Sequence, residues 1–177
     1  QAGPRTASQA AAPVVSVADD RARVRAGDLP LLIVEDDTAF AHILLDMARS
    51  HGFKALVAMR GDEAIALIDR YSLAAVSLDI FLPDMLGWTI LSHLKQHPET
   101  RHIPVQIVTV EEESQHGLER GAFAYLNKSA SSDQISDAFA KLKEFVQKRQ
   151  RKLLIIEPEA SAKSAISKMF KHEDVDV

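Results

Sequence analysis

The residues best suited to chemistry in this sequence are acids, a hydroxyl and a lysine, each at the end of a short apolar run. Glu35 and Asp36 directly follow one run. Asp79 directly follows a second run, Thr109 directly follows a third, and Lys128 comes two residues after a fourth. Carboxylates about 4 Å apart repel by about 4 kcal/mol per pair at an effective dielectric of about 20, so a cation is needed among them. Hard oxygen ligands of this kind suit Mg²⁺. A carboxylate beside Mg²⁺, a lysine and a hydroxyl is arranged for nucleophilic attack on phosphorus, with Asp79 as the expected acceptor.

The apolar runs that carry these residues have the length and composition of buried strands. The predicted strands are Leu31–Val34, Ala55–Ala58, Ala74–Leu78, Val105–Val108 and Ala122–Leu126. Between them, apolar residues recur at the spacing of one helix face. The helix stripes are Phe40, Ile43, Leu44 and Met47; Ala64, Leu67, Ile68 and Tyr71; Ile90, Leu91 and Leu94; and Ile135, Ala138, Phe139, Leu142 and Val146. Ser131 and Gln134 form a capping box that begins the last helix.

Strands and helices therefore alternate along the chain. Strands that are apolar on both faces and separated by helices predict a parallel sheet covered by helices on both sides, a doubly wound α/β domain. In such domains the ligand lies beyond the carboxyl ends of the strands, which is where the acids, the threonine and the lysine are placed.

The composition limits the functions that remain. The 177 residues are enough for one good core, and the absence of Cys excludes disulfide frameworks, thiolate metal sites and thiol enzymes. The chain has 21 Lys and Arg and 25 Asp and Glu, which gives a formal net charge of -4. Because this charge is negative, no bulk attraction to nucleic acid is expected. No apolar run is long enough to cross a bilayer, so we expect no direct membrane contact.

Four motifs in the same order resemble those of a response-regulator receiver domain. They are Leu-Ile-Val-Glu-Asp-Asp, Leu-Asp-Ile-Phe-Leu-Pro-Asp-Met-Leu-Gly-Trp, Ile-Pro-Val-Gln-Ile-Val-Thr and Gly-Ala-Phe-Ala-Tyr-Leu-Asn-Lys. The resemblance covers residues 30–149. It implies a flavodoxin-like, five-stranded parallel sheet of order 2-1-3-4-5.

The resemblance also implies a role for each matching residue. Asp79 resembles the phosphoacceptor, and Lys128 resembles the residue that pairs with the phosphoryl oxygens. The residues that resemble the Mg²⁺ ligands are Glu35, Asp36, Asp79 and, through its backbone carbonyl, Phe81. The residues that resemble the switch pair are Thr109 and Tyr125. The implied partner is a histidine kinase core or a phosphotransfer domain, and the implied location is the cytoplasm. The module would promote its own phosphorylation and dephosphorylation, while its parent protein would be a hybrid histidine kinase.

Three departures from the family pattern keep a second interpretation open. Ser129 replaces the usual proline after the lysine, so the cis bond found there in the family is not expected. Val110 replaces a small residue after the threonine, and the interval that contains residues 111–120 is short, so a short or irregular helix is expected there. These departures favour an unphosphorylated pseudo-receiver that regulates a kinase by binding it. An aspartyl phosphatase ranks last, because Phe81 stands where such an enzyme would have a second aspartate.

The ends of the chain differ from the central unit. Residues 1–29 are rich in Ala, Ser, Gly, Pro and Arg and are expected to be a linker. Residues 153–157 repeat the pattern of residues 31–35, so residues 150–177 resemble the start of a second, truncated receiver-like unit. Its exposed apolar residues make a homodimer through this segment a further hypothesis.

Overall fold

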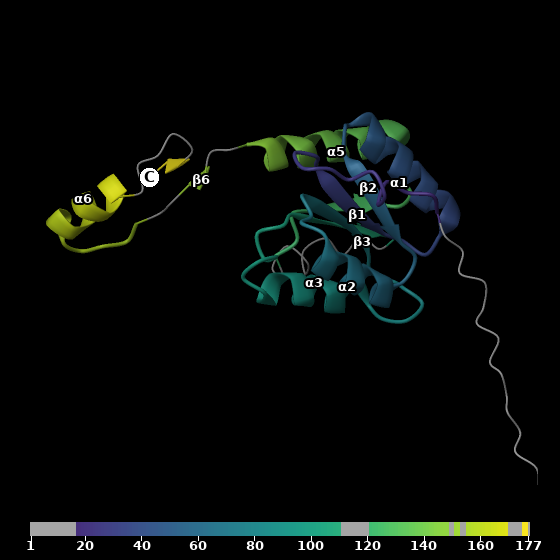
Figure 1. Ribbon diagram of the computed structural model, residues 1–177, viewed down its shortest axis with the longest axis horizontal. Helices are drawn as coiled ribbons and strands as arrows, with labels where there is room; N and C mark the ends of the chain where they lie inside the picture. The colour runs from purple at the N-terminus through teal and green to yellow at the C-terminus, as the bar shows by residue number, and fades with distance from the viewer. Residues whose placement is uncertain (1–16, 111–120, 149–150, 153–154, 170–174, 177) are drawn as a thin grey trace, which may run out of the picture.

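A computed structural model describes residues 17–110, 121–148, 151–152, 155–169 and 175–176. Its main unit is a five-stranded parallel sheet of order β2-β1-β3-β4-β5, which confirms the predicted fold (Figure 1). The strands are β1 (Pro30–Val34), β2 (Lys54–Ala58), β3 (Ala75–Asp79), β4 (Val105–Thr109) and β5 (Ala124–Asn127). Each lies within about two residues of its predicted run. The helix expected at residues 111–120 lies outside the described residues.

Helices cover both faces of the sheet because alternate strand residues point to opposite sides. Leu31 and Ile33 of β1 pack with α1 (Thr38–Ser50) and α5 (Ser132–Gln147) on one face. Leu32 and Val34 pack with α2 (Gly61–Arg70) and α3 (Gly87–Gln96) on the other face. Figure 1 shows α1 and α5 on one side of the sheet and α2 and α3 on the other. The sheet is therefore buried on both faces, and its carboxyl edge is left open for a site.

Local signals set the beginnings of two helices. Asp37 precedes α1, and its Oδ1 accepts hydrogen bonds from the backbone N–H groups of Ala39 and Phe40 at 2.8 and 3.0 Å. The predicted capping box of Ser131 and Gln134 is present at the start of α5. These caps satisfy N–H groups that have no partner inside the helix.

Part of the expected linker packs against the sheet. Val17 and Asp20 are buried, and the Asp20 N–H donates to the carbonyl of Ala55 at 2.9 Å. In return, the Ala55 N–H donates to Asp20 Oδ2 at 3.1 Å and the Val57 N–H to Asp19 Oδ2 at 2.8 Å. We call residues 17–28 the edge segment, because its backbone and carboxylates satisfy the outer edge of β2. The packed unit thus begins before residue 30.

The C-terminal segment also has β-α-β order, with β6 (Arg151–Lys152), α6 (Ala160–Met169) and β7 (Val175–Asp176). The two short strands pair in parallel, but α6 buries none of its side chains. Residues 155–157 of the strand predicted by the repeat are not in a strand, and residues 153–154 lie outside the described part.

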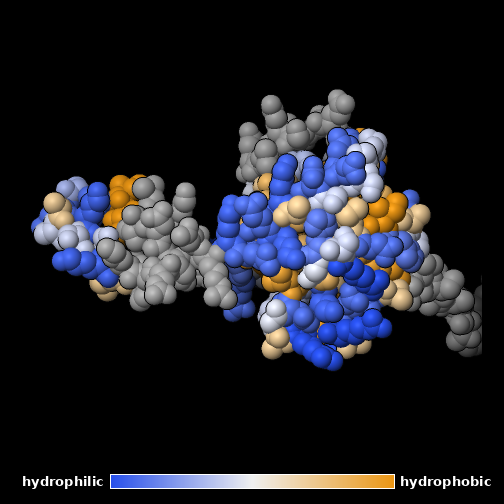
Figure 2. All heavy atoms as spheres, turned by 90° about the horizontal axis from the view of Figure 1, so that it is seen from above, coloured by the Kyte–Doolittle hydropathy of each residue, from blue (hydrophilic) through white to orange (hydrophobic). Residues whose placement is uncertain are grey.

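The surface of the main unit is mainly hydrophilic, with apolar side chains in small groups, in the view of Figure 2. Single exposed apolar residues are normal on a folded domain. Among the described residues, no helix is both long enough and apolar enough to span a membrane.

Candidate functional site

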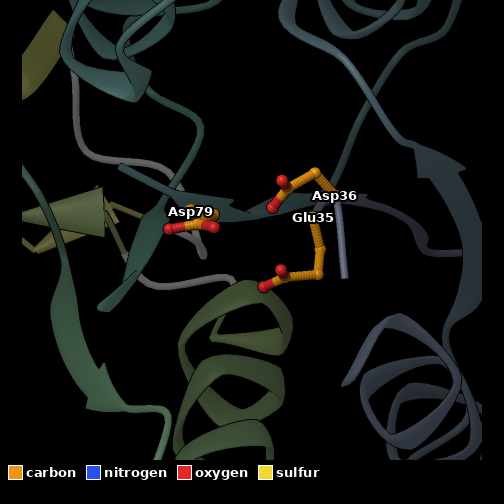
Figure 3. Close-up of side chains that lie close together, drawn as sticks. All are labelled: Glu35, Asp36 and Asp79. Carbon is orange, nitrogen blue, oxygen red and sulfur yellow. The ribbon is translucent and has the colours of Figure 1, made fainter. Parts of the chain in front are cut away.

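Three of the predicted acids meet at the carboxyl edge of the sheet. Glu35 and Asp36 directly follow β1, Asp79 ends the neighbouring β3, and one oxygen from each lies within 4.8 Å of the others. Figure 3 shows the three carboxylates facing one another. Glu35 and Asp79 are buried and Asp36 is exposed. The parallel topology brings them together, as the sequence predicted, because neighbouring parallel strands end at the same edge.

Lys128 supplies the positive charge within this cluster. Its Nζ donates to Glu35 Oε1 at 2.6 Å and to Asp79 Oδ2 at 2.8 Å. It also lies 5.5 Å from the ring centroid of Phe40, within the range of a cation–π contact. Burial lowers the pKa of Lys128, but the bonds to Asp79 and Glu35 together raise it by a larger amount. The net pKa is therefore above its usual value, and the ammonium stays charged.

Glu35 lies in an environment that disfavours its charged form. Burial raises its pKa, and the hydrogen bonds from Lys128 and the Asp37 N–H only partly offset this, so the net pKa of Glu35 is raised. Its Oε2 is buried and accepts no hydrogen bond from the described residues. A buried carboxylate oxygen in this state favours a further cation or a polar ligand beside it.

The loop after β5 holds Lys128 without the family's proline. Asn127 Oδ1 accepts hydrogen bonds from the Ser129 N–H at 2.8 Å and from Ser129 Oγ at 2.6 Å. The Lys128 N–H donates to the Thr109 carbonyl at 2.9 Å. The described residues contain no cis peptide bond. A side-chain turn at Asn127 therefore positions the lysine backbone.

Thr109 and Tyr125 lie on the two strands beyond β3. Thr109 is buried at the end of β4, where its neighbour Val108 pairs with Asp79. Tyr125 of β5 pairs with Ile107 and packs, partly buried, against the core on the α2 and α3 side. Thr109 therefore ends its strand at the carboxyl edge that carries the acids, whereas Tyr125 lies one strand further along and packs against the core. Val110 beyond Thr109 is exposed.

The loop between β3 and α3 begins at the expected acceptor. The Phe81 N–H donates to Asp79 Oδ1 at 3.1 Å, and Phe81 forms an isolated antiparallel bridge with Leu86. A Cβ on Gly87 would lie 2.1 Å from the Asp79 carbonyl oxygen, so this position requires glycine. The loop thus lies directly on the backbone of the acceptor.

Sequence reasoning missed two residues around this site. The sequence indicates Phe40 only as part of an apolar helix stripe and indicates no structural role for Asp84. The ring of Phe40 also faces Lys128, and Asp84 accepts hydrogen bonds from the start of α2. The spacing of neither residue indicates this, because the partners lie far away in the sequence.

The sequence matches a family of known proteins. The family model of the response regulator receiver domain matches residues 31–140. The response regulator PleD of Caulobacter vibrioides is 34% identical over 101 residues, which are 55% of this chain and 22% of PleD. The sensory transduction protein RegX3 of Mycobacterium tuberculosis is 34% identical over 108 residues, 59% of this chain and 46% of RegX3. The chain therefore spans less than half the length of these relatives.

Solved structures show the same fold. A receiver domain from Rhodospirillum rubrum superposes with a TM-score of 0.53 at 29% identity, covering 66% of this chain and 92% of that one. The receiver domain of the sensor histidine kinase PA1611 from Pseudomonas aeruginosa, with a magnesium ion coordinated in its active-site cleft, has a TM-score of 0.59 at 20% identity and covers 66% of this chain and 98% of that one. Taken with the acids and lysine at the carboxyl edge, the family match shows that this chain belongs to the response regulator receiver domains of two-component signal transduction.

Proposed function

We propose that this chain is a phosphoacceptor module that takes a phosphoryl group from the phosphohistidine of a histidine kinase or a phosphotransfer domain onto Asp79. The observation that carries the proposal is the Lys128 ammonium, which bonds Asp79 and Glu35 at once in a cluster that also holds Asp36. A carboxylate cluster needs a fixed cation before it can receive an anionic phosphoryl group.

The donor atoms also fit a magnesium ion. Carboxylate oxygens of Glu35, Asp36 and Asp79 lie close together, and the buried Glu35 Oε2 accepts no hydrogen bond from the described residues. Oxygen ligands with water in the remaining positions are what Mg²⁺ prefers. These three acids and the carbonyl of Phe81 would hold the ion. When bound, Mg²⁺ supplies charge neutralisation for the phosphoryl oxygens.

The chain's own residues perform the transfer. An Asp79 carboxylate oxygen attacks phosphorus, the P–N bond to the donor histidine breaks, and its electron pair stays on the imidazole nitrogen. Lys128 is already at Asp79 Oδ2, so it pairs with the phosphoryl oxygens without a large movement. The resemblance assigns Thr109 as the hydroxyl that bonds the new group and Tyr125 as the aromatic that responds to it.

Incubation with acetyl phosphate and Mg²⁺ tests this proposal. The wild type should gain the mass of one phosphoryl group at Asp79, and Asp79→Asn should gain none. Asp46→Asn, which removes an exposed acid of α1, is the matched control and should label like the wild type. An unlabelled wild type that still binds its kinase would instead support the pseudo-receiver, for which the exposed Val110 beside Thr109 is the main argument.

We extend the proposal to the organisation of the chain. Residues 30–149, with the edge segment packed on β2, would form the receiver and residues 150–177 the start of a second receiver-like unit. The parent protein would be a hybrid histidine kinase that works in the cytoplasm, where ATP supplies the phosphoryl group. Ile156 and Met169 are strongly exposed in the C-terminal segment, which supports a homodimer through it. Sedimentation that finds only monomer at high concentration would exclude that dimer.

A further inference from the structure

The loop between β3 and α3 caps a helix that lies elsewhere in the sequence. Arg60, which precedes α2, makes no side-chain capping bond to that helix. Instead, the N–H of Gly61 donates to Asp84 Oδ1 at 2.8 Å and the N–H of Asp62 donates to Asp84 Oδ2 at 2.9 Å. One carboxylate thus satisfies two of the N–H groups that begin α2.

The Asp84 carboxylate is well placed for this role. Its side chain is 12% exposed and lies 3.8 Å from the guanidinium of Arg60. Burial raises the pKa of Asp84, but the hydrogen bonds from the N–H groups of Gly61 and Asp62 contribute to a larger lowering. The net pKa of Asp84 is therefore below its usual value. The cap is therefore ionised at neutral pH, which suits the positive end of a helix dipole.

A second contact fixes the same junction. A Cβ on Gly61 would lie 2.3 Å from Cγ of Met85, so the Met85 side chain occupies the space directly above this glycine. Asp84 and Met85 are consecutive, and both hold the tip of the loop against the first turn of α2.

The two ends of the loop are attached to the site. At its start, the Phe81 N–H bonds Asp79 Oδ1 at 3.1 Å. At its end, the Gly87 N–H donates to the Ile80 carbonyl at 2.8 Å. The base of the loop therefore carries both the Phe81 carbonyl and the hydrogen bond to the Asp79 carboxylate.

We propose that Asp84 is a positioning residue for the phosphoacceptor site: by capping α2 it anchors the β3–α3 loop, and the anchored loop holds the Phe81 carbonyl and the Asp79 carboxylate in the geometry that binds Mg²⁺. This inference rests on the proposed function. Residues that orient metal ligands without touching the metal affect affinity by about 10- to 100-fold when they are removed.

Titration of the full chain with MgCl₂, followed by the fluorescence of Trp88, tests the inference. Trp88 is the only tryptophan and lies in the first turn of α3, immediately after the loop. Asp84→Ala removes both acceptor oxygens and should raise the Kd for Mg²⁺ about tenfold. Asp84→Asn keeps one acceptor oxygen and should lie between Asp84→Ala and the wild type. Isothermal calorimetry provides a second readout of the same Kd.

Asp62→Asn is the matched control, because it removes an acid from the same turn whose side chain is 62% exposed, and the asparagine oxygen can keep the one helix N–H that Asp62 Oδ1 accepts, that of Glu63 at 2.8 Å. Its Kd should stay within about twofold of the wild type. Thermal unfolding without Mg²⁺ is measured for each variant. A lower Tm for Asp84→Asn with an unchanged Kd would make the role purely structural and overturn the inference, even if Asp84→Ala does not fold.

The wild type separates this inference from the proposed function. If the wild type binds no Mg²⁺ and is not labelled at Asp79, the proposed function fails and the inference falls with it. If the wild type binds Mg²⁺ and is labelled, and Asp84→Asn binds Mg²⁺ equally well, only the inference is overturned.

Discussion

Lys128 Nζ lies 2.6 Å from Glu35 Oε1, in a contact between residues 93 positions apart. The same ammonium reaches Asp79, so a single side chain from the loop after β5 neutralises acids that follow β1 and end β3. The charge balance of the site, and not only its chemistry, therefore depends on Lys128. Since magnesium would act on the same acids, the lysine and the metal should partly substitute for one another in stabilising the fold.

Lys128→Met should lower the free energy of unfolding in the absence of Mg²⁺ by about 2 kcal/mol. Removing one partner of a buried ion pair leaves the other charge uncompensated, at a cost of about 3–5 kcal/mol for a full burial and less here because the Lys128 side chain is 20% exposed. Urea unfolding at 0 and 10 mM MgCl₂ measures this. Mg²⁺ should restore more stability to the variant than it adds to the wild type, and phosphorylation by acetyl phosphate should be nearly lost.

Lys141→Met on α5 is the control for Lys128→Met, because it removes an exposed lysine from the same part of the chain. Its unfolding free energy should change by less than about 0.5 kcal/mol. Equal effects of the two substitutions would mean that Lys128 is an ordinary surface lysine.

The sheet and the acids were predictable for the same reason. Apolar runs such as Leu31–Val34 mark strands locally, and parallel topology then places Glu35 and Asp79 at one edge without any knowledge of distances. Asp84 could not be predicted as a cap, because its partners at Gly61 and Asp62 are set by how the loop folds over α2.

The edge segment shows a different limit of sequence reasoning. Its composition is typical of a linker, and composition says nothing about which backbone groups its carboxylates will meet. Asp19 and Asp20 bond the N–H groups of Val57 and Ala55, which a strand at the sheet edge would otherwise expose. Such a contact exists only once β2 has been placed at the edge.

Asn127→Ala should leave the backbone of Lys128 less firmly positioned. The substitution removes the acceptor of the Ser129 N–H and hydroxyl, and we expect a loss of about 1 kcal/mol in unfolding free energy. Phosphorylation should slow several-fold while Mg²⁺ affinity changes little, because the hydrogen bonds of the Asn127 side chain within the described part of the chain go to Ser129 and not to a proposed metal ligand. Asn127→Asp, which keeps an acceptor oxygen, should restore most of the stability. If the alanine variant is labelled at the wild-type rate, the turn does not position the lysine.

Gly87→Ala should destabilise the domain although alanine favours helices. The new Cβ would lie 2.1 Å from the Asp79 carbonyl oxygen, and backbone atoms cannot rotate away as a side chain would. Overpacking of this kind costs about 1–3 kcal/mol. Denaturant unfolding checks the loss, with Ser92→Ala on the exposed side of α3 as the control that introduces no clash. Unchanged stability of Gly87→Ala would show that the loop can move away from Asp79.

Asp20 should make the edge segment sensitive to acid. Burial raises the pKa of Asp20. The bonds from Arg49 and the Ala55 N–H, together with the nearby charge of Lys54, lower it by a larger amount, so the net pKa of Asp20 lies below its usual 3.8. The folded state then binds this proton less readily than the unfolded state. The contribution of Asp20 is present in full above about pH 4 and is lost as the pH falls through the lowered folded-state pKa.

Comparison of Asp20→Asn with the wild type from pH 7 to pH 2.5 measures this contribution. At pH 7 the variant should be less stable by about 1 kcal/mol, because the charged acceptor of the Arg49 and Ala55 bonds is lost. The difference should shrink below pH 4, since the wild-type carboxylate becomes protonated as well. Asp137→Asn, at an exposed position of α5, should show no such convergence. A stability difference for Asp20→Asn that stays constant down to pH 2.5 would mean that the ionised carboxylate does not hold the edge segment on β2.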